Sequence, residues 1–256
     1  MFDSYSNIDS FKEASGYTID GVWYPRVTKI VSIKAKPALL WFYGEAANFK
    51  AAQSVTEKSA EEGTLVHEAA EAILLGQNPE VSPVIKPAID AFREFIETRN
   101  IHTATDWVER RICHRGERYA GTIDAMALID GKFGVLDIKT SQAIYRDYNL
   151  QTSAYVEALK DQFKNLQTRW ILRIDQISHC GRCEATLRTK GGREKIRNAK
   201  RASACPPGAH EWGDMQGEIE LQEFPYWQKD FEAFLGAKKL WEWENEFWLK
   251  KVGYLA

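Results

Sequence analysis

The feature that most constrains the fold is a β-hairpin centred on Asp130-Gly131. Two runs rich in apolar and β-branched residues, YAGTIDAMALI (119–129) and KFGVLDIKTS (132–141), flank this dipeptide. Asp-Gly is a strong signal for a two-residue turn between antiparallel strands, because both central positions of that turn adopt positive φ angles. If these two residues form the turn, Ile129 pairs with Lys132, and the same register sets Asp124 directly across from Asp137.

The hairpin places charged residues where charge is unfavourable. Asp137 and Lys139 lie two residues apart and share one face of their strand, so Leu136 and Ile138 point to the other face, into the core. Like charges directly opposite each other on a sheet repel. The pair of Asp124 and Asp137 therefore predicts a compensating cation, and oxygen ligands favour Mg²⁺ or Mn²⁺. The alternative is an exposed, solvated hairpin face.

The rest of the chain predicts an α/β (α+β) domain, in which helices flank a central mixed sheet. We expect one domain over 1–256, with a small insertion at 176–216. The expected elements are strands over 17–33 around the turn Asp20-Gly21, helices over 37–49, 56–75 and 84–98, a strand over 107–112, a helix over 148–163, strands over 168–175 and 217–224, and one closing helix over 226–249.

Several motifs occur in an order that is informative as a set. PRVTKIVSIKAKPAL (25–39) is followed by GTLVHEAAE (63–71), GTID (121–124), LDIKTS (136–141) and QTSAY (151–155). From about residue 24 to 175, this order resembles the PD-(D/E)XK nuclease superfamily. It is most similar to the RecB-type exonuclease branch, which includes the mitochondrial genome maintenance exonuclease and CRISPR-associated nucleases.

The resemblance implies roles for particular residues. His67, Asp124, Asp137 and the backbone carbonyl of Ile138 would bind Mg²⁺ or Mn²⁺. The remaining catalytic residues would be Lys139, at the attacking water or the developing charge, and Gln151 and Tyr155, which would face the site and contact DNA or order the lysine. Gly63 lies one helical turn before His67, on the same face, and would allow a close approach to the sheet. The alternatives are a structural His67 and a Tyr155 that packs into the core. Glu109 would either help bind a second metal or be a solvated strand residue.

The polar insertion carries a second candidate metal site. HCGRC and CPPGAH contribute three cysteines and two histidines, and C-x2-C-x21-C-x4-H is close to known zinc spacings. A segment this polar has too little core to fold alone, and a zinc ion would staple it. The preferred ligands are Cys180, Cys183, Cys205 and His210, and His179 could replace His210. Some relatives carry an iron–sulfur cluster with one cysteine upstream of the histidine motif. This chain has none there, and Cys113 is the alternative fourth thiolate.

Charge is distributed unevenly along the chain. The formal net charge is −2, so binding to DNA must rest on local patches. The segment from Arg169 to Arg201 contains ten Lys and Arg residues and three acidic residues, and this basic arm is the candidate phosphate contact. Its predicted DNA-binding residues are Arg188, Lys190, Arg193, Lys195 and Arg197. A solvated loop is the alternative. Trp227, Trp241, Trp243 and Trp248 could stack bases, but their helical spacing is typical of core residues.

The sequence thus predicts a divalent-metal-dependent DNA nuclease, acting as an exonuclease on single strands or free ends. Its other expected partner is a protein of a replication or recombination complex. The alternatives are an endonuclease of the same chemistry and a non-catalytic zinc-containing nucleic-acid-binding module. No apolar run reaches the length of a membrane span, and the first residues do not resemble a signal peptide. We therefore expect an intracellular, cytoplasmic protein of bacterial or phage-like type.

Overall fold

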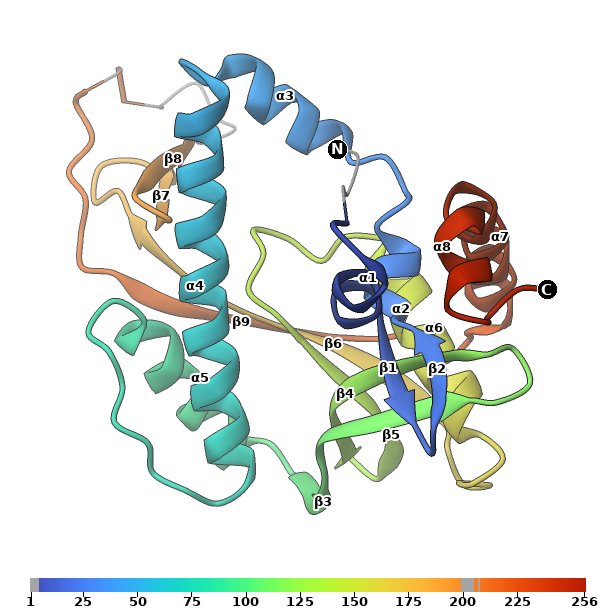
Figure 1. Cartoon of the computed structure of the whole chain (residues 1–256). Helices are drawn as coiled ribbons and strands as arrows, with labels where there is room; N and C mark the ends of the chain where they lie inside the picture. Colours follow the sequence, from blue (N-terminus) through green and yellow to red (C-terminus); the bar gives the residue numbers. More distant parts are fainter. Residues whose placement is uncertain (1–4, 199–204, 207) are drawn as a thin grey trace.

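A computed structural model describes residues 5–198, 205–206 and 208–256, and confirms an α/β architecture (Figure 1). In the described chain, a seven-stranded mixed sheet has the order β3-β4-β5-β6-β7-β8, and β9 pairs with β6. Its strands are β3 (Ile101–His114), β4 (Tyr119–Ile129), β5 (Lys132–Lys139), β6 (Thr168–His179), β7 (Thr186–Lys190), β8 (Arg193–Arg197) and β9 (Gln216–Glu223). The short strands β1 (Gly16–Ile19) and β2 (Val22–Pro25) form a separate hairpin.

Helices cover both faces of the sheet, and each face has its own hydrophobic core. On one face lie α1 (Ile8–Ser15), α2 (Val27–Val31), α6 (Tyr148–Leu159), α7 (Gln228–Glu244) and α8 (Glu246–Lys251). On the other face lie α4 (Phe49–Leu74) and α5 (Lys86–Thr98). The connecting helix α3 (Pro37–Glu45) has no buried residue and joins the two sets (Figure 1). The ends of β4 and β5 therefore lie where residues from both faces can meet.

The predicted hairpin is present in the predicted register. Asp130 and Gly131 both have positive φ angles, and the ladder runs from Ile129–Lys132 to Ala125–Leu136. It ends one pair before the two aspartates. At the same point the alternation of β4 changes, because Ile123 packs in the core beneath α6 whereas Ala125 packs in the core beneath α4.

Several predicted elements differ from the structure, and β3, predicted over 107–112, spans Ile101–His114. The segment after Pro25 was expected to be strand, yet Val27–Val31 is helical, because Val27, Ile30 and Val31 fall on one buried helical face. Helix α4 begins at Phe49 rather than near residue 56. The side chain of Asn48 caps this earlier start, because its oxygen accepts a hydrogen bond from Ala51 N at 2.8 Å.

The prediction of one continuous C-terminal helix over 226–249 is also wrong. It is divided into α7 and α8 at Asn245. The side chain of Asn245 donates to the carbonyl of Trp241, which is a local hydrogen bond that competes with continuation of the helix.

Candidate active site and candidate metal centre

The predicted catalytic residues of β5 lie together at the end of that strand. Asp137 is buried, with a side chain that is 1% exposed, and the Lys139 ammonium lies 2.5 Å from its Oδ2. Lys139 Nζ also lies 3.4 Å from the carbonyl oxygen of Ile138, which is the predicted backbone ligand. Leu136 and Ile138 alternate with them and pack into the core beneath α4, as predicted. The strand period thus separates two charged side chains from two core side chains.

Asp124 occupies the point where β4 leaves the ladder. Its Oδ2 accepts a hydrogen bond from Ile138 N at 2.5 Å, so the carboxylate is held along the edge of β5. His67, from α4 on the opposite face, places Nδ1 3.9 Å from the same oxygen. The change of alternation at Asp124 therefore lets one site gather residues from both sides of the sheet.

Helix α6 supplies the third side of the site. Gln151 Nε2 donates to Asp137 Oδ1 at 3.0 Å and to the Tyr155 hydroxyl at 3.1 Å. Tyr155 is only 2% exposed and packs in the core beneath α6, where Gly121 makes room for its ring. The structure shows the core alternative for the ring of Tyr155, and its hydroxyl points to Gln151. It reaches the site through Gln151 and does not lie on a surface.

A glycine lets α4 approach the end of β5, as the sequence predicts. A Cβ on Gly63 would lie 2.9 Å from Thr140 Oγ1, which is too close for any other residue without a shift. Because His67 lies one turn further along α4, this contact sets the distance of the imidazole from the strand.

The electrostatic environment keeps the imidazole neutral and the lysine charged. Burial lowers the pKa of His67 to about 4, and the Lys139 charge acts in the same direction. Burial raises the pKa of Asp137 to about 6. Burial alone would lower the pKa of Lys139, but the carboxylates of Asp137 and Asp124 outweigh it and raise that pKa. At neutral pH, His67 therefore offers a free lone pair to a cation.

Two further carboxylates extend the acidic cluster. Glu71 and Glu109 line a cleft of about 430 Å³ beside α4, together with His67 and Thr140. Glu109 adopts a φ of 49°, a left-handed conformation that is unfavourable for a non-glycine residue. Although Glu109 is exposed to the cleft, partial desolvation raises its pKa to about 7, with contributions from the charges of Asp124 and Glu71. Sequence reasoning missed Glu71, although its spacing of four residues from His67 places both on one helix face.

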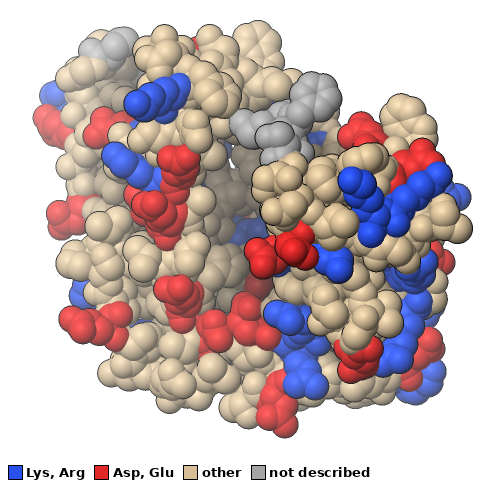
Figure 2. Space-filling model, viewed as in Figure 1, with Lys and Arg blue, Asp and Glu red and all other residues tan. Residues whose placement is uncertain are grey.

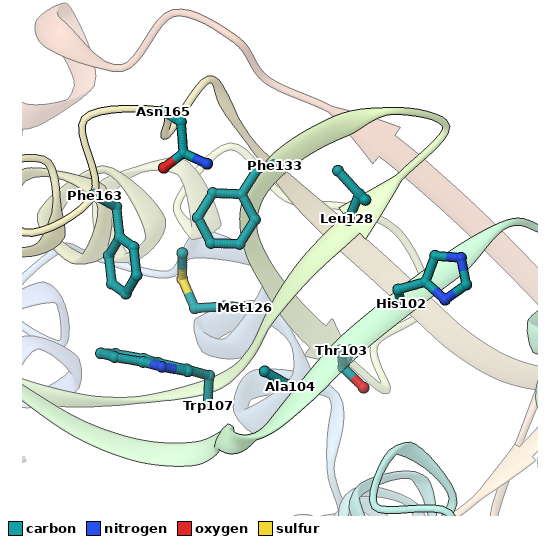
Figure 3. Close-up of a pocket in the computed structure, with 9 residues that line it drawn as sticks. All are labelled: His102, Thr103, Ala104, Trp107, Met126, Leu128, Phe133, Phe163 and Asn165. Carbon is teal, nitrogen blue, oxygen red and sulfur yellow. The ribbon is translucent and has the colours of Figure 1, made fainter.

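Figure 2 shows this face of the molecule hollowed beside α4, with acidic and basic side chains around the hollow. A larger pocket, of about 520 Å³, lies elsewhere, beside the irregular stretch of β3 between Thr103 and Val108 (Figure 3). Aromatic and apolar side chains such as Trp107, Phe133 and Phe163 line it, and it holds none of the predicted catalytic residues. The candidate site is therefore identified by its convergent charged groups and not by the size of its pocket.

The structure brings the preferred ligand set of the insertion together. Ligand atoms of Cys180, Cys183, Cys205 and His210 all lie within 4.8 Å of one another, so this Cys₃His group can bind a metal ion such as zinc. Cys180 Sγ and Cys205 Sγ are 4.0 Å apart, and Cys183 Sγ lies 3.5 Å from His210 Nδ1. Tetrahedral zinc with sulfur at about 2.3 Å holds its ligand atoms roughly 3.8 Å apart.

The alternative ligands lie outside this group. Cys113 is on β3, paired with Ala120, and so is not a fourth thiolate of the cluster. His179 ends β6 and is likewise not one of the four residues. His210 takes the fourth position and stacks on Trp212 with ring centroids 4.7 Å apart.

The basic arm is less uniform than its sequence suggests. Arg169 is fully buried and pairs with Asp230, and Arg173 is held by Asp175, Glu218 and Glu220. These two arginines are structural, so the predicted charge excess overstates what a ligand can meet. Lys200 and Arg201 lie outside the described residues.

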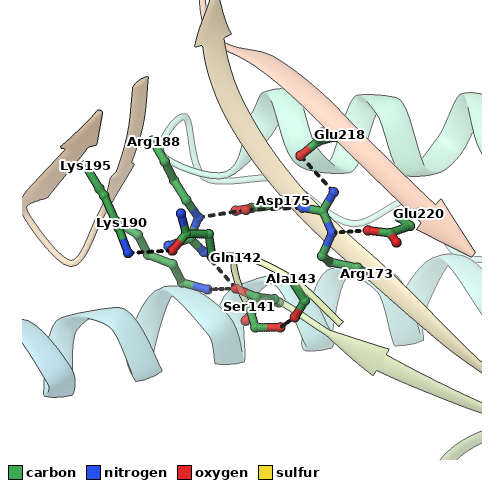
Figure 4. A network of polar contacts seen from close by, with 11 residues as sticks. Ser141, Gln142, Ala143, Arg173, Asp175, Arg188, Lys190, Lys195, Glu218 and Glu220 are labelled. Atoms are coloured by element: carbon green, nitrogen blue, oxygen red, sulfur yellow. Dashed lines mark hydrogen bonds and ion pairs between the residues drawn. The ribbon is translucent and has the colours of Figure 1, made fainter. Parts of the chain in front are cut away.

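The five predicted DNA contacts divide between the two strands of the β7–β8 hairpin. Arg193, Lys195 and Arg197, on β8, are exposed. Arg188 and Lys190, on β7, are partly buried and point toward the end of β5 (Figure 4). The tryptophans of the C-terminal helices differ in exposure, since Trp241 lies in the core and Trp243 is 72% exposed.

No protein-family model and no curated protein sequence matches this chain. The crystal structure of SSO0001 is similar with a TM-score of 0.37 and 16% identity, over 86% of this chain and 75% of that one. At this level, the similarity carries no argument about fold family or function.

Along the described residues, the helices are too short or too polar to cross a membrane.

Proposed function

We propose that this chain is a divalent-metal-dependent nuclease with a PD-(D/E)XK core, which hydrolyses DNA from single-stranded or free ends. The observation that carries the proposal is the convergence of His67, Asp124, Asp137 and Lys139, from three different elements, at the end of one hairpin. Charged groups held this close and this buried are costly to a fold, and such clusters are typical of functional sites.

The donor set fits a hard divalent cation. Asp124, Asp137, Glu71 and Glu109 supply carboxylates around a neutral imidazole, and Lys139 is the cation closest to Asp137. Asp137 Oδ2 is buried and, among the described residues, has no hydrogen bond beyond its contact with Lys139. His67, Asp124, Asp137 and the Ile138 carbonyl would hold Mg²⁺ or Mn²⁺. Such an ion, when bound, would polarise the phosphate and lower the pKa of a water molecule.

The residues around this donor set have separate tasks. Lys139 remains protonated and can donate to the attacking water or to the negative charge that develops on the phosphate. Gln151 fixes the Asp137 carboxylate, and Tyr155 fixes Gln151 from the core. This chain of contacts reduces the freedom of the catalytic groups, as efficient catalysis requires.

Exposed aromatic and basic residues support a single-stranded substrate. Every residue of α3 is at least partly exposed, and Trp41 is 72% exposed. Arg193 of the hairpin lies over the Phe42 ring of α3, 4.6 Å from its centroid. Aromatic side chains interleaved with cations bind unpaired bases and phosphates with little sequence preference.

End-labelled linear and circular single strands, digested with Mn²⁺ or Mg²⁺, test this function. We expect linear strands to be degraded from an end and circles to remain intact, with no cleavage when Asp137 is replaced by Ala. Cleavage of circles would assign an endonuclease. Binding of DNA without cleavage of either substrate would overturn the proposal in favour of a non-catalytic binding module.

A further inference from the structure

Two cations of the β7–β8 hairpin converge on one backbone carbonyl beside the candidate active site. Lys190 Nζ donates to the carbonyl oxygen of Thr140 at 2.5 Å, and Arg188 donates to the same oxygen at 3.1 Å. Thr140 follows Lys139 directly. The Arg188 guanidinium is held in turn by Asp175 at 2.7 Å (Figure 4). The insertion therefore contacts the catalytic strand at the residue next to its lysine.

The turn of the same hairpin is seated on α4. Gly191, at a φ of 61°, packs so closely that a Cβ there would lie 2.2 Å from Ser59 Oγ and 2.5 Å from Val55 O. Its amide donates to Glu62 Oε1 at 2.9 Å. This contact lies immediately before Gly63, the residue through which α4 approaches Thr140. One hairpin thus contacts α4 and the residue that follows β5, which are two of the three elements that carry the candidate metal ligands.

We propose that the β7–β8 hairpin is a brace for the active site, in which Lys190 and Arg188 are positioning residues that hold the Thr140 carbonyl while Gly191 seats the turn on α4. The brace fixes the spacing between His67 on α4 and Asp137 and Lys139 on β5. This inference rests on the proposed nuclease function, and it reassigns Arg188 and Lys190 from DNA contacts to support of the site.

The geometry favours support over DNA contact for these two residues. Lys190 and Arg188 are partly buried and donate to acceptors inside the protein, whereas the three basic residues of β8 are exposed, although one of them, Lys195, also donates to Gln142 Oε1 at 2.9 Å. Burial lowers the pKa of Lys190 to about 8, and the charge of Arg188 acts in the same direction. A phosphate contact would have to break bonds that hold the strand end. A positional shift of about 1 Å at a catalytic group can lower a rate by roughly a hundredfold.

Neighbouring glycines give a matched test of the seat on α4. Gly191 and Gly192 both have positive φ angles, so an alanine at either position is strained, but only a Cβ at Gly191 meets α4. We expect Gly191→Ala to lower kcat on single-stranded DNA by about tenfold or more, with KM little changed. Gly192→Ala should have a smaller effect on kcat. Equal kcat values for the two variants would overturn the brace.

Substitution of Lys190 separates positioning from DNA contact. Lys190→Met should lower kcat by roughly tenfold without weakening DNA binding, as loss of an outer support does at other sites. Lys190→Arg keeps a donor for Thr140 and should recover most of the rate. A raised KM with unchanged kcat would overturn the assignment and make Lys190 a DNA contact.

Hydrogen exchange distinguishes an error in the proposed role of the hairpin from an error in the proposed nuclease function. In Gly191→Ala, amides of α4 near Val55–Gly63 and of the segment after Lys139 should exchange faster than in Gly192→Ala. If the wild-type protein cleaves nothing but the two variants differ in this way, the nuclease proposal fails and the contact between hairpin and helix stands. If cleavage is present and neither exchange nor kcat differs, the brace fails and the nuclease proposal stands.

Discussion

The candidate active site and the Cys₃His centre hold polar groups together by different physical means. At the active site, Asp137 and Lys139 are fixed by β5, whose alternate residues lie in a large apolar core. At the Cys₃His centre, Cys180 is buried, but Cys183, Cys205 and His210 are only partly buried and lie in loops outside regular strands and helices. Strands and helices position the first site, whereas a metal ion bound by all four residues would connect the loops of the second.

This difference sets what each site requires from a metal. The carboxylates of the candidate active site lie on strands and helices that position them, so a bound ion would mainly relieve their mutual repulsion. None of the four residues of the Cys₃His group belongs to either hydrophobic core, so bound metal would supply folding energy directly. Loss of metal should therefore affect activity at one site and local structure at the other.

The largest expected effect is on cleavage. Asp137→Ala and Asp124→Ala should each lower the Mn²⁺-dependent rate on single-stranded DNA by on the order of a thousandfold. Each should also weaken Mn²⁺ binding measured by calorimetry. The far-ultraviolet circular dichroism spectrum should stay unchanged, because the core holds this end of the sheet. Either variant cutting at the wild-type rate would remove that aspartate from the site.

Replacement of Lys139 should lower the cleavage rate but leave metal binding nearly unchanged. Lys139→Ala is expected to lower kcat by about a hundredfold, because the ammonium acts on the water or the transition state. Its Mn²⁺ affinity should remain within a few fold of wild type. A large loss of Mn²⁺ affinity would show instead that the lysine is required to assemble the donor set.

At the second site, loss of one ligand should disrupt structure locally. The purified protein should contain about one tightly bound zinc, and Cys183→Ser should release it. Amide exchange should then rise across 180–198 and 208–212, while the β4–β5 hairpin keeps its protection. Elemental analysis and exchange mass spectrometry measure the two outcomes. Iron in place of zinc would show that the centre binds a different metal. A metal-free wild-type protein with three freely titrating thiols would show that these residues form no metal centre.

A smaller effect on cleavage is expected from the exposed side chains of β8, whose described contacts are with Gln142, Glu45 and Phe42 and not with a candidate metal ligand. The three exposed cations of β8 can be reversed together as Arg193→Glu, Lys195→Glu and Arg197→Glu. Each phosphate contact on a single strand contributes a log–log salt slope of about −0.7, so the slope should flatten by about two units. At saturating DNA the rate should change little. An unchanged slope would place the DNA path away from this strand.

The smallest expected effect concerns the pH dependence of stability in metal-free protein. Partial desolvation and the charges of Asp124 and Glu71 raise the pKa of Glu109 to about 7 from 4.5, so the folded state retains a proton that the unfolded chain releases. Stability should therefore fall as pH rises between these values and remain lower above them. Glu109→Gln should raise Tm little at pH 4.5 and most at pH 8. An equal change in Tm at both pH values would contradict the assigned cause.

Local chemistry made much of this structure predictable from the sequence. The Asp130-Gly131 turn set the register of β4 and β5, and the strand period separated Asp137 and Lys139 from Leu136 and Ile138. Short spacings likewise identified Gly63 beside the end of β5. These features depend on neighbours within a few residues, where backbone geometry leaves few alternatives.

Other features required the tertiary structure, because they depend on elements far apart in the chain. The change of alternation at Asp124 brings His67 to the same oxygen that binds Ile138 N. Burial of Arg169 and Arg173 removes two charges that a count along the sequence includes. The contact of Lys190 with Thr140 joins residues separated by 50 positions. Sequence fixes which side chains a strand or helix presents together, but the packing of distant elements decides which of them meet and which charges remain available to a ligand.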